Sequence, residues 1–169
     1  PLLRRRGRER LADPVAELVR REARGVDHQV GLAPKLLQDV PLLPDALDAA
    51  ARDHGAKLIC LTPTIQNPTT VTMPARRRQE IVRIARARDL TIIEDDPYSL
   101  LAGDAPPPFA VLAPERTFHV ATLSKVLTPG LRTAFIVVPL GRNRDALVSV
   151  LRAICVMPAP LMTALATHW

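Results

Sequence analysis

Short apolar runs alternate with amphipathic stretches along most of this 169-residue chain, and the alternation predicts its secondary structure. Apolar runs rich in strand-forming residues predict β-strands over residues 57–62, 90–93, 117–122 and 133–138. Apolar residues at helical spacing predict amphipathic helices over residues 74–89 and 142–157. Strands that alternate with helices indicate an α/β fold with a mostly parallel sheet.

The first part of the chain and the connections show weaker patterns. Four apolar residues at helical spacing predict one amphipathic helix near the N-terminus: Leu11, Val15, Leu18 and Val19. Residues 47–53 predict a short helix closed by Gly55. Residues 64–72 and 109–114 are expected to be connections without regular structure.

Composition favours one domain, or a piece of a larger one, with an aliphatic core, because 47% of the residues are hydrophobic and only 3% are aromatic. The net charge is +6, and arginines crowd the N-terminus at Arg4-Arg5-Arg6, Arg8 and Arg10. A solvated basic tail is the favoured interpretation of this cluster. Direct nucleic-acid binding is the alternative, and it predicts an affinity that falls steeply with salt.

Several kinds of site are not expected from the sequence. Cys60 and Cys155 lie in apolar stretches, which predicts small buried hydrophobic residues rather than a disulfide framework. The 4 histidines are scattered without metal-ligand spacing, so no metal site is expected. No run of about 18 apolar residues and no signal-peptide pattern occurs, which predicts a cytoplasmic protein without a membrane segment.

Polar motifs follow three of the predicted strands. Gln66-Asn67-Pro68-Thr69 follows the first strand, Glu94-Asp95-Asp96-Pro97-Tyr98 the second, and Ser124-Lys125 the third. The carboxyl ends of parallel strands meet at one sheet edge, where open α/β sheets bind ligands. A lysine, a carboxylate, a phenol, an amide, hydroxyls and an arginine together match the aldehyde, ring nitrogen, phenolic oxygen and phosphate of pyridoxal 5'-phosphate.

These motifs resemble the signatures of the fold-type-I pyridoxal-phosphate superfamily. The similarity is to class I/II aminotransferases and to the aminotransferase-like domain of MocR-type members of the GntR regulator family. It rests on Thr-Pro-Thr-x-Gln-Asn-Pro-Thr at 62–69, Glu-Asp-Asp-Pro-Tyr at 94–98 and Ser-Lys-x-Leu-x-Pro-Gly-Leu-Arg at 124–132. The resemblance implies that residues 44–169 form part of a large domain, a three-layer αβα sandwich. Residues 1–43 are a basic N-terminal segment with no clear pattern, and residues 1 to about 40 do not resemble the family section expected there.

The resemblance also implies roles for individual side chains. Lys125 would carry the Schiff base with the cofactor and later move the α-proton of the substrate. Asp95 would keep the ring nitrogen protonated, and it stands three residues before Tyr98, as in the family. The remaining contacts are implied for Asn67 and Tyr98 at the phenolic oxygen, and for Thr122, Ser124 and Arg132 at the phosphate.

Ordinary structural explanations exist for several of these residues. Asn67 before Pro68 could initiate a turn, Tyr98 could be a half-buried packing residue, and Asp95 could be a loop acid or helix cap. Lys125 could be a surface lysine at a strand end. Against this, Lys125 alone has polar motif residues beside it, because Lys35 and Lys57 lack comparable neighbours.

Neighbouring residues are expected to play structural parts. Glu94 and Asp96 should cap a helix or face solvent, and the run Arg76-Arg77-Arg78 should be solvated. Gly130 should let the backbone turn so that Arg132 points back at the site, although a loop glycine can also be without function.

The sequence also departs from the family pattern. Thr70 and Ala134 stand where glycines are common, which affects the expected loop geometry, the first more than the second. No glycine-rich phosphate loop or ring-stacking aromatic residue precedes Asn67, and a small C-terminal domain with a carboxylate-binding arginine is not found. We therefore expect the chain to be a fragment.

Two functions follow from the resemblance. The first is a pyridoxal-phosphate-dependent aminotransferase core that acts on an amino acid and a keto acid, within a homodimer of the full-length protein. The second is a non-enzymatic effector domain of a MocR-type transcription regulator, which would contact DNA only through an upstream helix-turn-helix module. The isolated fragment is expected to be weakly active or inactive.

Overall fold

The computed structural model describes residues 43–168, and the helix predicted around Leu11 to Val19 lies outside this range. The helices are α3 (Pro44–His54), α4 (Ala75–Ala87), α5 (Phe109–Leu112), α6 (Arg144–Cys155) and α7 (Pro160–His168). The strands are β1 (Leu58–Leu61), β2 (Thr91–Asp96), β3 (Thr117–Thr122) and β4 (Ala134–Val137). Short 3₁₀ turns follow β2 at Ser99–Leu101 and precede β4 at Pro129–Leu131.

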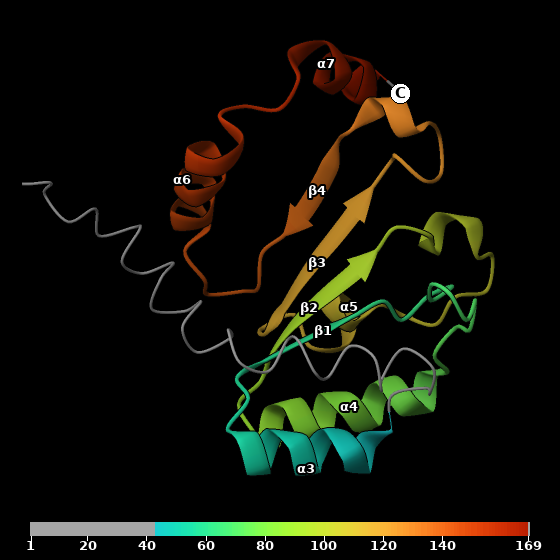
Figure 1. Cartoon of the computed structure of the whole chain (residues 1–169), viewed down its shortest axis with the longest axis vertical. Coiled ribbons are helices and arrows are strands. Elements are labelled where there is room, and N and C mark those ends of the chain that lie inside the picture. Colours follow the sequence, from blue (N-terminus) through green and yellow to red (C-terminus); the bar gives the residue numbers. More distant parts are fainter. Residues whose placement is uncertain (1–42, 169) are drawn as a thin grey trace, which may run out of the picture. The chain divides into compact units, whose positions relative to one another are not determined.

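The four strands form one sheet in the order β1-β2-β3-β4. Strands β1, β2 and β3 are parallel, and β4 pairs antiparallel to β3. Helix α4 makes the crossover between the neighbouring parallel strands β1 and β2 (Figure 1). The predicted α/β class with a mostly parallel sheet is therefore confirmed.

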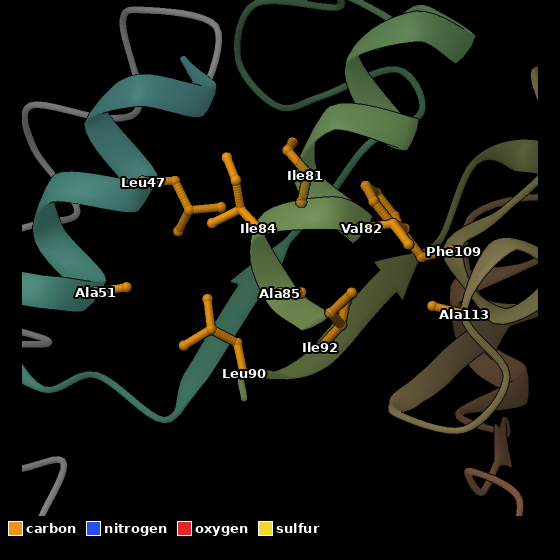
Figure 2. Packing of buried hydrophobic residues seen from close by; sticks show 10 residues of the cluster. All are labelled: Leu47, Ala51, Ile81, Val82, Ile84, Ala85, Leu90, Ile92, Phe109 and Ala113. Atoms are coloured by element: carbon orange, nitrogen blue, oxygen red, sulfur yellow. The ribbon is translucent and has the colours of Figure 1, made fainter. Parts of the chain in front are cut away.

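The core lies where α3, α4 and α5 cover one face of this sheet. Ile81, Ile92 and Phe109 are completely buried, and each stabilises the fold by roughly 1.5–3 kcal/mol through apolar burial. Figure 2 shows these side chains within one cluster: Leu47, Ala51, Ile81, Val82, Ile84, Ala85, Leu90, Ile92, Phe109 and Ala113. The members come from α3, α4, β2 and α5 and their flanking residues, so the crossover unit buries its own apolar face.

The ends of the helices follow from local sequence. Gly55 closes α3 in a left-handed conformation with φ 63°, as predicted. Pro74 stands just before α4, where its missing N–H costs no helical hydrogen bond. The Asn143 side chain caps α6 by accepting hydrogen bonds from the N–H groups of Asp145 (3.0 Å) and Ala146 (3.1 Å).

Two predicted boundaries are wrong. Strand β2 continues through Glu94 to Asp96 rather than ending before the acidic run, because buried partners satisfy Glu94 and Asp96. Residues 109–112 form the short helix α5 within the predicted connection, and Phe109 anchors that helix in the core. The strand predicted over 117–122 is confirmed as β3.

The prediction that both cysteines are buried is also wrong. Cys60 and Cys155 are exposed. Cys60 lies on β1, on the sheet face opposite α4, where no described helix covers it, and Cys155 ends α6, which buries no residue. Among residues 43–168, no helix is both long and apolar enough to cross a membrane.

Candidate cofactor site

Strand register brings the three polar motifs to one edge of the sheet. Leu61, the last residue of β1, pairs with Glu94, and Asp96, the last residue of β2, pairs with Ala121 near the end of β3. The parallel strands β1, β2 and β3 therefore end at one common edge (Figure 1). The segments that carry Asn67, Tyr98 and Lys125 all leave the sheet there, as the sequence predicts.

Asp95 lies on the sheet face opposite the buried core. Side chains alternate along β2, so Glu94 and Asp96 point toward α4 and α5 while Asp95 points to the other face. The register pairs Asp95 with Val120 on β3, and Thr122 is two residues farther along the same face. Asp95 and Thr122 consequently share the open face at the edge that carries the motifs.

Hydrogen bonds to Thr122 organise the backbone that leads to Lys125. The Thr122 hydroxyl donates to the Thr133 carbonyl (3.0 Å) and accepts from the Ser124 N–H (3.1 Å). The Leu123 N–H also donates to the Thr133 carbonyl, at 3.4 Å. These bonds tie the end of β3 to the start of β4 and leave the Lys125 side chain exposed.

Arg132 itself makes the backbone turn that was predicted for Gly130. Arg132 has φ 47°, whereas Gly130 has no left-handed φ and lies in the 3₁₀ turn Pro129–Leu131. A Cβ added at Gly130 would meet only the Thr128 hydroxyl, at an ordinary 3.8 Å. The prediction for Gly130 is therefore wrong, because the change of chain direction occurs two residues later.

The loop that carries Asn67 is closed by its own backbone. The Met73 N–H donates to the Pro63 carbonyl (2.8 Å), and the Gln66 N–H donates to the Val71 carbonyl (3.0 Å). Thr70, which stands where the family commonly has glycine, has φ 58°. A β-branched residue is strained in this left-handed region, so the departure from the family pattern has a structural cost.

Partial desolvation and neighbouring charge raise the pKa of two groups on the open face. Desolvation raises the pKa of Asp95, and the adjacent Asp96 carboxylate raises it further. Desolvation also raises the pKa of the Cys60 thiol, with a smaller contribution from Asp95. A cationic ligand beside Asp95 would reverse the effect on that carboxyl, since an opposite charge favours the ionised form.

The available donors and acceptors fit pyridoxal 5'-phosphate. Within residues 43–168, six of the predicted side chains make no hydrogen bond: Asn67, Asp95, Tyr98, Ser124, Lys125 and Arg132. Thr122 differs, because its hydroxyl proton is engaged by Thr133. The edge therefore offers an amine, a carboxylate, a phenol, an amide, a hydroxyl and a guanidinium for a ligand that carries an aldehyde, an aromatic nitrogen and a phosphate.

Arg78 corrects the prediction that the arginine run of α4 is solvated. Arg76 is exposed, but the Arg78 side chain is 1% exposed, and its guanidinium lies 6.0 Å from the centre of the Phe109 ring. Desolvation lowers the pKa of Arg78, while Glu94 and Asp96 raise it. Helical spacing carries a signal for this burial, because Arg78 shares one helix face with Ile81, Val82 and Ala85.

Glu94 and Asp96 act as caps, as predicted, but they are buried instead of facing solvent. Glu94 accepts hydrogen bonds from the N–H groups of Phe109 (2.9 Å) and Ala110 (3.1 Å) at the start of α5. Asp96 accepts from the Ser99 N–H (3.1 Å) in the turn after β2. Ile92, Glu94 and Asp96 are spaced by two residues along β2, and this spacing is the sequence signal that all three share the inward face.

His119 joins the two buried carboxylates from the neighbouring strand. Its Nδ1 lies 2.9 Å from Glu94 Oε2, and its Nε2 lies 3.8 Å from Asp96 Oδ2. The hydrogen bond to Glu94 raises the pKa of His119, and the two negative charges support this rise against desolvation. The sequence showed only that the histidines lack metal-ligand spacing, and it did not identify these partners of His119.

Two other features of the described residues do not add to the site. No group of 3 or more His, Cys, Asp and Glu residues between positions 43 and 168 is arranged to hold a metal ion. A depression of about 320 Å³ lies between α3 and α4, with Asp48, Arg52 and Arg83 in its lining. It contains none of the predicted site residues.

Comparisons with known proteins identify relatives of two kinds. The family described as "Aminotransferase class I and II" matches residues 28–169. An uncharacterized HTH-type transcriptional regulator of Bacillus subtilis, YdeF, is 33% identical over 147 residues, which are 79% of this chain and 32% of the regulator. An uncharacterized aminotransferase of Saccharolobus solfataricus, SSO0104, is 38% identical over 93 residues, 53% of this chain and 23% of the relative.

A similar structure has also been solved. The crystal structure of a multiple substrate aminotransferase from Thermococcus profundus matches with a TM-score of 0.58 and 28% sequence identity. The match covers 68% of this chain and 29% of that chain. In these comparisons the chain spans about a third of the length of its relatives or less.

Proposed function

Because the chain belongs to the family of class I and II aminotransferases, we propose that it binds pyridoxal 5'-phosphate and forms the core of an amino-group transferase. The substrates would be an amino acid and a keto acid. The observation that carries this proposal is the common edge of β1, β2 and β3, from which Asn67, Tyr98 and Lys125 project after successive strands.

Lys125 performs the covalent part of the proposed reaction. Its amine would hold the cofactor aldehyde through a Schiff base, formed with loss of water, and, once the substrate amine has displaced it, would move the α-proton of the substrate. When bound, the cofactor supplies an electron sink for the electron pair released at the substrate α-carbon. The exposed position of Lys125 beyond β3 leaves its amine accessible for both tasks.

Asp95 holds the proton on the ring nitrogen in this proposal. A carboxylate about 4 Å from a cation contributes roughly 4 kcal/mol at an effective dielectric constant near 20. Its position on the open face, two residues before Thr122 in register, lets a flat ring lie across β2 and β3. Asn67 and Tyr98 would donate hydrogen bonds to the phenolic oxygen.

The phosphate is assigned to the residues on either side of Lys125. Ser124 and Arg132 have polar atoms without partners among the described residues, and the guanidinium fork of Arg132 suits a phosphate. Thr122 would have to turn its hydroxyl away from the Thr133 carbonyl before it could donate to the phosphate. We therefore expect Ser124 and Arg132 to contribute more than Thr122.

Borohydride trapping tests the proposal directly. The protein that carries this chain is mixed with pyridoxal 5'-phosphate and reduced with borohydride, and the modified peptide is mapped. We expect the label on Lys125 and its loss in Lys125→Ala. Lys57→Ala is the matched control, because Lys57 stands at the amino end of β1, away from the motif edge, and should label like wild type. Label on another lysine, or equal labelling of Lys125→Ala, would refute the assignment.

A regulatory function is the second candidate, and one observation favours it. The matched segment of the regulator YdeF covers 79% of this chain, compared with 53% for the aminotransferase SSO0104. In this alternative the same residues bind the cofactor as a signal, within an effector domain of a MocR-type regulator. Turnover of an amino acid with a keto acid by the labelled protein supports the enzyme, whereas labelling without turnover, together with a helix-turn-helix module in the same gene product, supports the regulator.

Three further parts of the proposal concern the surroundings of the site. We propose that residues 44–169 form part of an aminotransferase-like large domain and that the full-length protein is a cytoplasmic homodimer. The basic segment that could contact nucleic acid, Arg4 to Arg10, lies outside the described residues. Flat salt dependence of nucleic-acid affinity would exclude a role for it in backbone binding.

A further inference from the structure

Arg78 connects segments that are distant in sequence and that border the candidate site. Its guanidinium donates to the carbonyls of Pro63 (3.2 Å) and Met73 (3.1 Å), and to the Thr64 hydroxyl (3.0 Å). Pro63 and Met73 are also the two residues whose backbone hydrogen bond closes the loop that carries Asn67. One buried side chain thus holds both ends of this loop.

The same guanidinium reaches the second motif through Glu94. Arg78 Nη1 lies 3.9 Å from Glu94 Oε1 and donates to the Pro107 carbonyl at 3.2 Å. Glu94 is completely buried and directly precedes Asp95 in β2. Because neighbouring strand residues point to opposite faces, a fixed Glu94 side chain fixes the direction of Asp95 on the open face.

His119 and Asp96 extend the contacts to the turn that carries Tyr98. His119 binds Glu94 from β3, and Asp96 accepts from the Ser99 N–H beside Tyr98. No buried side-chain nitrogen or oxygen among the described residues lacks a hydrogen-bond partner. A fully satisfied buried polar network holds its members in one geometry, because any displacement leaves a desolvated group unpaired.

We propose that Arg78 is a positioning residue for the cofactor site: it holds the loop of Asn67 directly and the β2 terminus of Asp95 through Glu94, and so keeps the two in one fixed relation. The inference rests on the proposed function for its consequence, cofactor affinity, but not for the contacts. Arginine suits this position because its planar guanidinium donates hydrogen bonds in several directions at once, whereas the donors of a lysine all lie on one compact ammonium group.

Amide hydrogen exchange of the protein that carries this chain, without cofactor, tests the connection. In Arg78→Lys we expect faster exchange, by about tenfold or more, at Met73 in the loop and at Phe109 and Ala110, the amides held by Glu94. Arg76→Lys is the matched control, since Arg76 lies on the same helix, is exposed and pairs with Glu80 alone among the described residues. It should leave all three amides unchanged.

Cofactor affinity tests the consequence for the site. Titration with pyridoxal 5'-phosphate, followed by the absorbance of the lysine adduct, should give a dissociation constant about tenfold higher for Arg78→Lys than for wild type, at a temperature where both are folded. Glu94→Gln is the second variant, because it keeps the shape but removes the charge that two amides and His119 contact. It should weaken binding in the same direction, and Arg76→Lys should bind like wild type.

The outcomes separate this inference from the proposed function. If wild type forms no adduct on Lys125 while Arg78→Lys still loosens both segments, the proposed function fails and the network stands. If the adduct forms with equal affinity in wild type and Arg78→Lys, or if exchange increases at Met73 but not at Phe109 and Ala110, the inference is overturned. Failure of both Arg78→Lys and Glu94→Gln to fold would also overturn it, because the network would then support the whole core rather than the site.

Discussion

The described residues before Lys125 and those after it differ in how far their apolar side chains are buried. Before Lys125, Ile81, Ile92 and Phe109 are completely buried within one cluster. After it, Leu131 is buried, but all residues of β4 are exposed, and α6 and α7 contain no buried residue. Both parts have apolar residues in regular patterns, so pattern alone does not determine burial.

The difference depends on whether the described residues offer each helix a surface to pack against. Helix α4 connects β1 to β2, so the crossover returns its apolar face to the strands that it joins. Helix α6 follows the antiparallel strand β4, and the described residues provide no surface against which it buries a side chain. Ile154 is 69% exposed there, although it shares a helix face with Leu147, Val150 and Leu151. A crossover helix packs on the strands that it joins, whereas no described residue covers the apolar face of α6.

The largest effect on stability is expected when one isoleucine from each part is replaced by alanine. Ile81→Ala, in the buried face of α4, should destabilise the protein by about 2–5 kcal/mol, because it removes buried methyl groups and leaves a cavity. Ile154→Ala, in α6, should change stability by no more than about 0.5 kcal/mol. Denaturant unfolding of the two variants measures both values. Equal losses of stability in the two variants would mean that α6 is buried to the same extent as α4, and would contradict the difference between the two parts.

A smaller effect concerns the pH dependence of the covered part. Because Glu94 raises the folded-state pKa of His119 above 6.5, this hydrogen bond stabilises the fold fully below pH 6.5 and loses its effect as pH rises through the raised value. The loss should not exceed the roughly 1.5–3 kcal/mol of a hydrogen bond to a charged group. Unfolding free energy measured across this range should fall in wild type and stay flatter in His119→Gln. His168→Gln, in the exposed helix α7, should keep the wild-type slope.

The smallest effect should remain local to the second part. Asn143→Ala removes the cap that accepts two N–H groups of α6, which costs about 1 kcal/mol of helix stability. Because α6 buries no residue, amide exchange within α6 should accelerate while the global unfolding midpoint stays unchanged. A shift of the global midpoint would contradict this and would show that α6 unfolds together with the core.

Most of the elements and the position of the candidate site were predictable from the amino-acid sequence. The sequence patterns located the four strands and helices α3, α4 and α6, whereas α5 and α7 were not predicted. The register of β1, β2 and β3 then brought Asn67, Asp95, Tyr98 and Lys125 to one edge. These features were predictable because helical and strand periods are local, and because parallel strands place their carboxyl ends together. The residue assignments at the site remain predictions.

The burial of individual polar side chains became apparent only in the folded structure. Glu94 was expected to cap or face solvent, yet its partners Phe109, Ala110 and His119 are 15, 16 and 25 residues away. Arg78 was expected in solvent, yet Pro63, Thr64 and Pro107 accept its hydrogen bonds. A charged side chain can be buried when groups distant in sequence replace its hydrogen bonds to water. Its burial therefore depends on contacts that the local sequence does not contain.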